Sequence, residues 1–197
     1  MAPVTQDSRL NDELNSACAL WLRGIAHQDE GALAAMYDAT LGKCHALALR
    51  ITRTHESAEE VVCDTFMQVW REAGRYDPAR WRPLAWLLNI CRSRAIDHLR
   101  QCDRAEPHED PAALMTEAVV DSADPLSLVL TLESNSEVRR AIEQPPMLSQ
   151  QLLALAFFRG LSHQEIAEHM NMPLGTVKTH LRRTQESLRG LLTEGRS

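Results

Sequence analysis

The sequence predicts an all-α protein with two helical domains joined by a flexible acidic linker. Apolar residues recur at three- and four-residue steps in several segments, as in helices that bury one face, and no segment shows the alternation of a β-strand. Residues 101–130 interrupt this pattern, because they hold seven acidic residues, three prolines and a single arginine. We therefore assign residues 18–100 to a first domain, 101–130 to the linker and 131–197 to a second domain.

The amino-terminal segment divides into a leader and two helices. Residues 1–17 are mostly polar and are expected to form a flexible leader, whereas Cys18–Ile25 and Gly31–Thr52 show helical spacing. The expected core face of the second of these helices carries Leu33, Met36, Tyr37, Leu41, Ala48 and Ile51.

Two further helices are expected in the first domain. Ser57 and Glu60 have the spacing of a capping box and predict a helix start, and acidic residues suit its first turn. Tyr76-Asp77-Pro78 ends this helix, and a short loop leads to the next one. The expected buried stripes are Val62, Phe66, Val69 and Trp70 in the earlier helix, and Leu84, Leu88, Cys91, Ala95 and Leu99 in the later one.

The stretch from Arg75 to Arg100 is locally basic. It holds six arginines and two acidic residues, interleaved with Tyr76, Trp81 and Trp86. Cations neutralise phosphates and aromatic rings stack on unpaired bases, so this pattern suits a single-stranded nucleic acid. Taken alone, it is equally typical of a surface of mixed charge around a core tryptophan.

The second domain is expected to contain a helix-turn-helix. Helical spacing resumes near Leu132, breaks at Pro145-Pro146 and returns in an apolar helix that Gly160 ends.

The helix-turn-helix itself is expected from Leu161 to Arg189. Ser162 and Glu165 form a capping box, Asn171 suits a positive φ at the turn, and Pro173 suits the first turn of the last helix. The inner stripe of that helix is expected to be Val177, Leu181, Thr184 and Leu188. Its outer side carries Thr176, Lys178, Thr179, Arg182 and Arg183. Such side chains suit phosphates and major-groove base edges, although spacing alone does not separate a DNA-reading face from a solvated one.

Composition excludes several classes of protein. The net charge is −6 at pH 7, so any contact with nucleic acid must use local basic patches. The polar beginning has no signal peptide and no stretch is apolar enough to span a bilayer, which predicts a cytoplasmic protein without membrane insertion. The five cysteines are far apart, as expected of reduced thiols that mostly fill the core. No catalytic motif is present, so we expect no enzymatic activity, cofactor or bound metal.

Two blocks of sequence, taken in series, resemble one family. Residues 58–100, AEEVVCDTFMQVWREAGRYDPARWRPLAWLLNICRSRAIDHLR, resemble the promoter-melting domain of extracytoplasmic-function sigma factors, which belong to the sigma-70 family of RNA polymerase subunits. Residues 141–189, which include LSHQEIAEHMNMPLGTVKTHLRR, look like the carboxy-terminal domain of the same family. The resemblance implies a protein that binds core RNA polymerase and directs it to promoter DNA.

The resemblance also implies roles for individual residues. In the helix that grips the polymerase clamp, the matching residues are Asp64, Thr65, Gln68 and Trp70. In the loop and helix that bind the melted minus-ten element, they are Arg80, Trp81, Arg82, Trp86, Asn89, Arg92, Ser93 and Arg100. In the helix that enters the major groove at the minus-thirty-five element, they are Thr176, Lys178, Thr179, Arg182 and Arg183. An anti-sigma factor is a further implied partner, since such proteins are usually held inactive by one.

Two departures from the family pattern leave the identity of the captured base open. Trp81-Arg82-Pro83 stands where many relatives have a Gly-Ser-aromatic run, and Cys91-Arg92-Ser93 stands where many have Ala-Arg-Asn. The acidic linker, for its part, suits either a mimic of the phosphate backbone within the polymerase or a plain solvated tether.

Two other functions fit parts of the sequence. A stand-alone regulator of the LuxR type shares GTVKTHL and would bind duplex DNA without polymerase, but it does not explain residues 59–100. A thiol or metal sensor could use Cys44-His45 or Cys63, although their spacing is not that of a ligand set.

Overall fold

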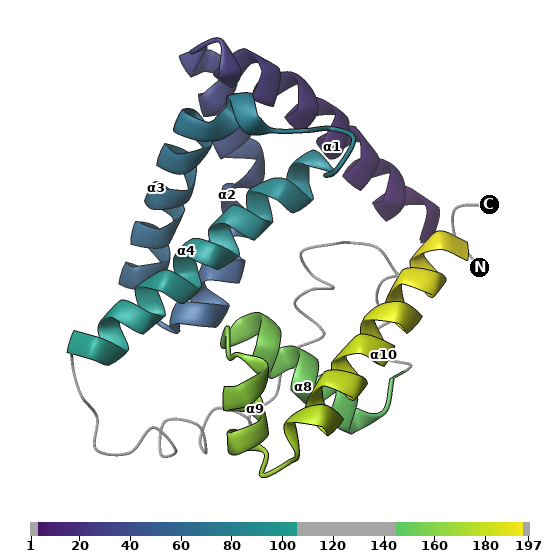
Figure 1. The fold of residues 1–197 in the computed structure, drawn as a ribbon. Helices are drawn as coiled ribbons and strands as arrows, with labels where there is room; N and C mark the ends of the chain where they lie inside the picture. Colours follow the sequence, from purple (N-terminus) through teal and green to yellow (C-terminus); the bar gives the residue numbers. More distant parts are fainter. Residues whose placement is uncertain (1–3, 106–144, 195–197) are drawn as a thin grey trace. The chain divides into compact units, whose positions relative to one another are not determined.

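The computed structural model describes residues 4–105 and 145–194, and these form two compact units that we treat separately (Figure 1). The first unit lies within residues 1–117 and the second within residues 118–197. Every regular element in the described ranges is a helix, as the sequence predicts. Residues 101–105 of the predicted linker belong instead to the last helix of the first unit, which ends at Ala105. The rest of the linker and the helix expected near Leu132 lie outside the described residues.

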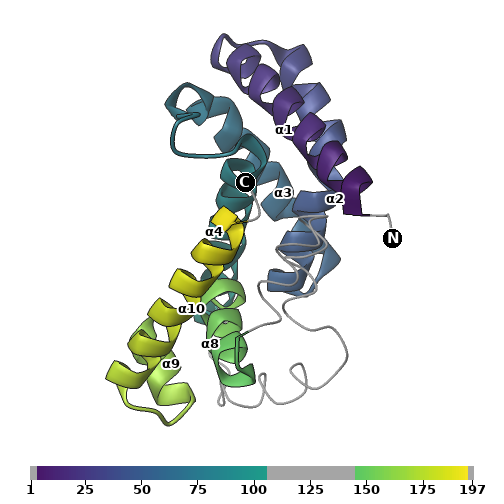
Figure 2. The ribbon, with the colours of Figure 1, turned by 90° about the vertical axis from the view of Figure 1, so that its right-hand side faces the viewer.

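The first unit is a bundle in which helices far apart in sequence pack side by side (Figures 1 and 2). Its elements are α1 (Val4–Ala26), α2 (Glu30–Thr52), α3 (His55–Glu72), the short 3₁₀ helix η1 (Ala73–Arg75) and α4 (Pro83–Ala105). Each helix buries one apolar face in a common core, which includes Leu22, Ile25, Met36, Leu47, Ile51, Val61, Val62, Val69 and Leu87.

The prediction of a flexible leader over residues 1–17 is wrong, because α1 already begins at Val4. Two polar residues in its first half bond to the start of α4 and to the residue before it. The Asn15 side chain accepts a hydrogen bond from the backbone of Leu84, and the Asp12 carboxylate pairs with Arg82. Contacts of this kind stabilise a helix that its own sequence would not predict.

The start of α3 also differs from the prediction. Its N-cap is Thr54, whose hydroxyl accepts the N–H of Ser57 at 3.3 Å, so the helix begins one turn earlier than a capping box at Ser57 and Glu60 would place it. Thr54 has extended backbone angles, which suit an N-cap residue.

The buried stripes follow the prediction in α3 and partly in α4. Val62, Phe66 and Val69 are buried and Trp70 is half-buried. In α4, Leu84, Cys91 and Ala95 are buried as expected, whereas Leu88 and Leu99 are half-buried and Leu87 and Ile96 are buried in their place. This helix is apolar on more than one side, so periodicity does not identify its inner face.

Three of the five cysteines lie in the core of the first unit. Cys18, Cys44 and Cys91 are fully buried, while Cys63 and Cys102 are exposed. Burial raises the pKa of the Cys18 thiol to about 11, which keeps it protonated at neutral pH.

The second unit consists of α8 (Met147–Phe158), α9 (His163–His169) and α10 (Leu174–Glu194). Its predicted helix ends are confirmed: Ser162 and Glu165 form a capping box, Gly160 has φ 60° and Asn171 has φ 49°. Pro173 immediately precedes α10, and its carbonyl accepts the N–H of Val177 at 3.2 Å.

The core of the second unit joins all three helices. Leu152, Ile166, Val177 and Leu181 are almost completely buried, and Thr184 is 4% exposed, so the predicted inner stripe of α10 is confirmed over these positions. The side chain of Leu188 lies outside the described residues.

The close approach of α1 and α2 at Gly24 gives a test of the packing in the first unit. A Cβ added at Gly24 would lie 2.7 Å from the Cβ of Ala32, a short and rigid side chain, so the two helices would have to separate. We therefore expect Gly24→Ala to lower the free energy of unfolding by about 1–3 kcal/mol, although alanine is the better helix former.

Gly42→Ala in α2 is the matched control. Nothing lies within 4 Å of a Cβ added there, so this substitution should raise the free energy of unfolding by about 1 kcal/mol. Urea unfolding followed by circular dichroism measures both variants. Equal and stabilising effects would contradict a close contact between α1 and α2 at Gly24.

Candidate nucleic-acid interface

The loop between η1 and α4 is held by its own hydrogen bonds. The Asp77 carbonyl accepts the N–H groups of Arg80 and Trp81 at 3.1 and 3.2 Å, and the Asp77 carboxylate accepts the N–H of Ala79 at 2.9 Å. The Tyr76 hydroxyl donates to the Trp81 carbonyl at 2.8 Å. Hydrogen bonds to the turn at Asp77 and from the Tyr76 hydroxyl therefore join the beginning of the loop to Arg80 and Trp81.

The two tryptophans of this region differ in their surroundings. Trp86, in the first turn of α4, is half-buried, and its ring lies edge-on to that of Tyr76 with the ring centroids 5.6 Å apart. Trp81 is 45% exposed at the tip of the loop. The ring of Trp81 is therefore the more accessible one for stacking on a base. The ring of Trp86 instead packs against Tyr76, which bonds to the loop.

Burial and the neighbouring Asp77 carboxylate raise the pKa of Tyr76. The phenol therefore remains a protonated donor at neutral pH, which its bond to the Trp81 carbonyl requires.

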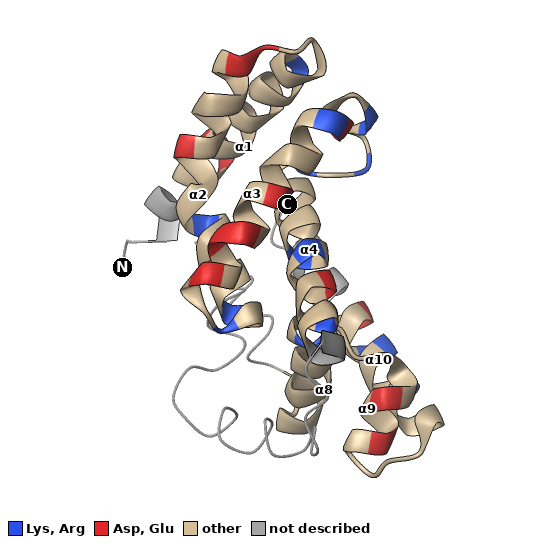
Figure 3. Cartoon of the chain, turned by 90° about the vertical axis from the view of Figure 1, so that its left-hand side faces the viewer, with Lys and Arg blue, Asp and Glu red and all other residues tan. Residues whose placement is uncertain are grey.

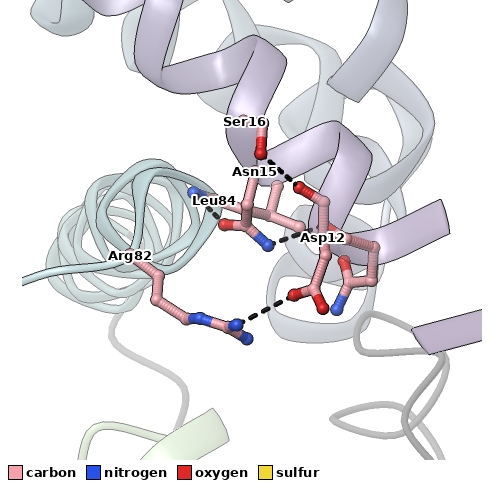
Figure 4. Close-up of polar contacts among 6 residues, drawn as sticks. Asp12, Asn15, Ser16, Arg82 and Leu84 are labelled. Atoms are coloured by element: carbon pink, nitrogen blue, oxygen red, sulfur yellow. Dashed lines mark hydrogen bonds and ion pairs between the residues drawn. The ribbon is translucent and has the colours of Figure 1, made fainter. Parts of the chain in front are cut away.

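The end of the loop is fastened to α1 (Figure 4). Arg82 Nη2 lies 2.9 Å from Asp12 Oδ1, and the N–H of Leu84 donates to Asn15 Oδ1 at 3.2 Å. Sequence reasoning missed both residues of α1. Their partners lie about seventy positions further along the chain, so no local pattern could have identified them.

Most of the residues expected to line a single strand are exposed, either on α4 or in the loop before it. Asn89, Ser93 and Arg100 are exposed, as are Arg80 and Arg82 in the loop. Basic residues gather on this loop and on α4, whereas acidic residues mark α3 (Figure 3).

Arg92 is half-buried, unlike Asn89, Ser93 and Arg100. Burial and the nearby charge of Arg100 lower the pKa of Arg92, although an arginine remains charged at neutral pH.

One residue that was expected on the exposed face of α3 lies in the core. Thr65 is fully buried, and its hydroxyl donates to the Val61 carbonyl at 2.7 Å, so it does not reach the surface. Threonine is polar, but a hydrogen bond to its own helix satisfies the hydroxyl and allows the side chain to be buried.

The other expected residues of α3 remain accessible to different degrees. Asp64 is exposed, while Gln68 and Trp70 are half-buried. Gln68 accepts from Arg94 Nε at 2.6 Å and donates to Glu72 at 3.2 Å, which ties α3 to α4.

The exposed face of α3 has an apolar member that sequence reasoning did not single out. Met67 is 58% exposed and lies one turn from Asp64. Its helical spacing from Asp64 was the signal that could have found it.

In the second unit, α10 presents a basic face opposite its buried stripe. Lys178, Thr179, Arg182 and Arg183 are exposed, as predicted, and Thr176 is half-buried. The Arg182 guanidinium lies 3.2 Å from Glu186, and both side chains are largely exposed. An exposed pair of this kind is worth only about 0–1 kcal/mol, so a phosphate can displace Glu186 at little cost.

No group of three His, Cys, Asp or Glu side chains within residues 4–105 and 145–194 is arranged to hold a metal ion. Among the helices of these ranges, none combines the length and the hydropathy that a membrane span requires. Of the cysteines that suggested a sensor, Cys44 is fully buried and Cys63 is exposed on α3.

Two family models match the chain, one in each unit. Residues 36–105 match Sigma-70 region 2, and residues 136–187 match Sigma-70, region 4.

Similar proteins match over nearly the whole chain. The ECF RNA polymerase sigma factor SigK of Mycobacterium sp. (strain JLS) is 32% identical over 193 residues, which cover 97% of this chain and 96% of that protein. The protein of the same name from Mycobacterium tuberculosis (strain ATCC 25618 / H37Rv) is 31% identical and is matched over 96% of this chain and 98% of its own length. Among solved structures, Rhodobacter sphaeroides SigE in complex with the anti-sigma ChrR is 28% identical, with a TM-score of 0.47 and coverage of 87% of this chain and 98% of that chain.

The hydrogen bond from Tyr76 to Trp81 can be tested directly. We expect Tyr76→Phe to speed hydrogen exchange of the Arg80 and Trp81 amides, because the loop loses the bond that closes it. The free energy of global unfolding should fall by less than about 1.5 kcal/mol, the net value of one hydrogen bond. Amide exchange followed by NMR measures the local effect.

Tyr37→Phe serves as the control for the same chemical change elsewhere. The Tyr37 ring packs edge-on against Phe66 and would keep that contact. Exchange in the loop that stays at the wild-type rate in Tyr76→Phe would show that the loop does not depend on this bond.

Proposed function

The chain belongs to the extracytoplasmic-function sigma factors of the sigma-70 family, and we propose that it binds core RNA polymerase and directs initiation at promoters with minus-ten and minus-thirty-five elements. The family consists of transcription initiation factors, and we propose no catalytic activity for this member. The observation that carries the proposal is the presence, in one chain, of a basic loop with an exposed tryptophan and of a helix-turn-helix with an exposed basic face.

The first unit is proposed to hold the melted minus-ten strand. A base that leaves the duplex loses a few kcal/mol of stacking and pairing, and stacking on an aromatic ring returns about 1–3 kcal/mol. The exposed Trp81 offers such a ring, and Arg80 and Arg82 lie beside it in the chain. On α4, Arg92 and Arg100 would bind the backbone of the same strand through their positive charge.

The second unit is proposed to read the minus-thirty-five element. Lys178, Thr179, Arg182 and Arg183 are exposed on the second helix of the helix-turn-helix, which is the helix that enters the major groove in this motif. Thr176, near the start of α10, is half-buried, and a place at the edge of that contact suits it best.

The exposed face of α3 is proposed to bind the polymerase. It combines the charge of Asp64, the half-buried Gln68 and Trp70, and the apolar Met67, a mixture that is typical of protein interfaces. Thr65 has no part in this surface, because it is buried.

Two further parts of the proposal rest on the family alone. We propose that an anti-sigma factor controls this protein, and that the protein acts in the cytoplasm, where polymerase and promoters are found. The stand-alone LuxR-type alternative has no comparable support, because the match to sigma factors extends over both units.

Run-off transcription tests the proposal. Start sites mapped after overexpression of the chain in a related host would define a candidate promoter. Purified core polymerase with this chain should then give a transcript from that promoter. Core polymerase alone should not. A transcript pattern that the chain leaves unchanged would overturn the proposal.

The basic face of α10 is expected to contribute to promoter binding through backbone charge. Arg182→Ala should weaken binding of the holoenzyme to duplex promoter DNA about threefold to tenfold. The slope of log affinity against log salt concentration should become shallower by about one, because one phosphate contact is lost. Binding to core polymerase should stay unchanged. Glu186→Gln should have the opposite effect on affinity, because it removes the partner of Arg182.

Titrations at several salt concentrations measure these effects. Arg23→Ala, which removes an exposed arginine from the last turn of α1, is the charge-matched control. An equal loss of affinity in Arg23→Ala and Arg182→Ala would argue against a specific role of α10.

A further inference from the structure

One face of α1 contacts the residues with which α4 begins. Asp12 and Asn15 are three positions apart, so they lie on the same side of the helix. Both point toward the segment around Arg82 and Leu84 (Figure 4).

Asn15 performs the task of an N-cap for a helix to which it does not belong. The first N–H groups of any helix have no partner within that helix. The residue before Pro83 is Arg82, whose side chain has no acceptor and so cannot cap α4. The N–H of Leu84 instead donates to Asn15 Oδ1 at 3.2 Å.

The amide of Asn15 is oriented by a second bond. Its Nδ2 donates to the carbonyl of Asn11 at 2.8 Å, one turn earlier in α1. With the nitrogen occupied in this way, the oxygen is turned toward Leu84.

Asp12 engages the adjacent arginine of the loop. Arg82 Nη2 lies 2.9 Å from Asp12 Oδ1, and the two side chains are 53% and 60% exposed. Water screens such a pair strongly, so it orients Arg82 without fixing it. A phosphate presents the same kind of oxygen and could take the place of the carboxylate.

We propose that Asn15 and Asp12 are positioning residues for the minus-ten loop: Asn15 fixes the point where the loop joins α4, and Asp12 holds the Arg82 guanidinium until a DNA phosphate displaces it. The proposal rests on the proposed function of the loop. The loop then has two anchors, the turn at Asp77 with Tyr76 at one end and α1 at the other. In the absence of DNA, Asp12 also makes Arg82 less available to unrelated single strands.

The role of Asn15 is tested with Asn15→Leu and Asn15→Asp. Leucine has a similar size and removes the acceptor, whereas aspartate keeps an oxygen for the N–H of Leu84. The probe is the mapped promoter prepared as a duplex with an unpaired minus-ten region, bound by reconstituted holoenzyme. We expect about tenfold weaker binding for Asn15→Leu and a smaller loss for Asn15→Asp, which keeps the acceptor but loses the bond to Asn11. Binding to core polymerase should be unchanged in both.

Hydrogen exchange of the Leu84 amide gives a second readout that does not depend on DNA. It should be faster in Asn15→Leu and near the wild-type rate in Asn15→Asp, and thermal melting shows whether each variant is folded. Rapid exchange of this amide already in the wild type, or wild-type promoter binding by Asn15→Leu, would overturn the role of Asn15.

The role of Asp12 is tested against its neighbour in the same helix. Asp12→Asn should raise affinity for a single strand of unrelated sequence about threefold and change binding of the pre-opened promoter less. The ratio of promoter affinity to affinity for the unrelated strand should therefore fall. Glu13→Gln removes the same charge from an adjacent exposed position and should leave discrimination unchanged. Equal effects of the two variants would show a general effect of charge and overturn the role of Asp12.

Failure of the proposed function and failure of this inference give different experimental results. A wild-type holoenzyme that does not prefer the pre-opened promoter over an unrelated bubble refutes that function and this inference together. A wild-type preference that Asn15→Leu retains refutes the inference alone.

Discussion

The start of α4 is the constraint on which the arrangement of the first unit depends. A helix that begins with proline after an arginine has no side chain of its own to accept its first N–H groups, so an acceptor must come from elsewhere. Asn15 supplies it, and in doing so it draws α1 against the loop that precedes α4. Further along, α4 is held against α3 by its buried apolar face and by the hydrogen bond from Arg94 to Gln68.

Weak ion pairs allow a chain with a net negative charge to offer arginines to a nucleic acid. Arg82 and Arg182 each face a carboxylate across a short distance, and all four side chains are well exposed. Pairs of this type contribute little to folding, so they can be exchanged for phosphates at small cost. The overall charge of −6 therefore does not oppose local binding, because the relevant cations are already oriented and only loosely engaged.

The sequence was informative where structure is decided locally. The capping box at Ser162, the positive φ of Gly160 and Asn171 and the buried stripe of α10 all depend on residues within one or two turns, and each was predictable. The start of α3 was missed locally, because Thr54 and not Ser57 caps that helix. The error in the amino-terminal segment has the opposite origin. The leader and the role of α1 depend on partners about seventy residues away, and no spacing rule reaches that far.

The residues of the candidate site were predictable from the sequence to different degrees. Exposure of the basic residues on α10 followed from periodicity, whereas the burial of Thr65 required knowing that its hydroxyl bonds to its own helix. The inner face of α4 was only partly predictable because several of its sides are apolar, and tertiary packing decides which of them is buried.

The exposure of Trp81 has a practical consequence. The chain has four tryptophans, and Trp21, Trp70 and Trp86 are half-buried, while Trp81 is 45% exposed. Water-soluble quenchers will therefore reach its indole most readily, and the part of the intrinsic fluorescence that they remove reports mainly on the tip of the loop. A nucleobase stacked on that ring would shield it from the same quenchers, so the protein carries its own optical probe of strand capture.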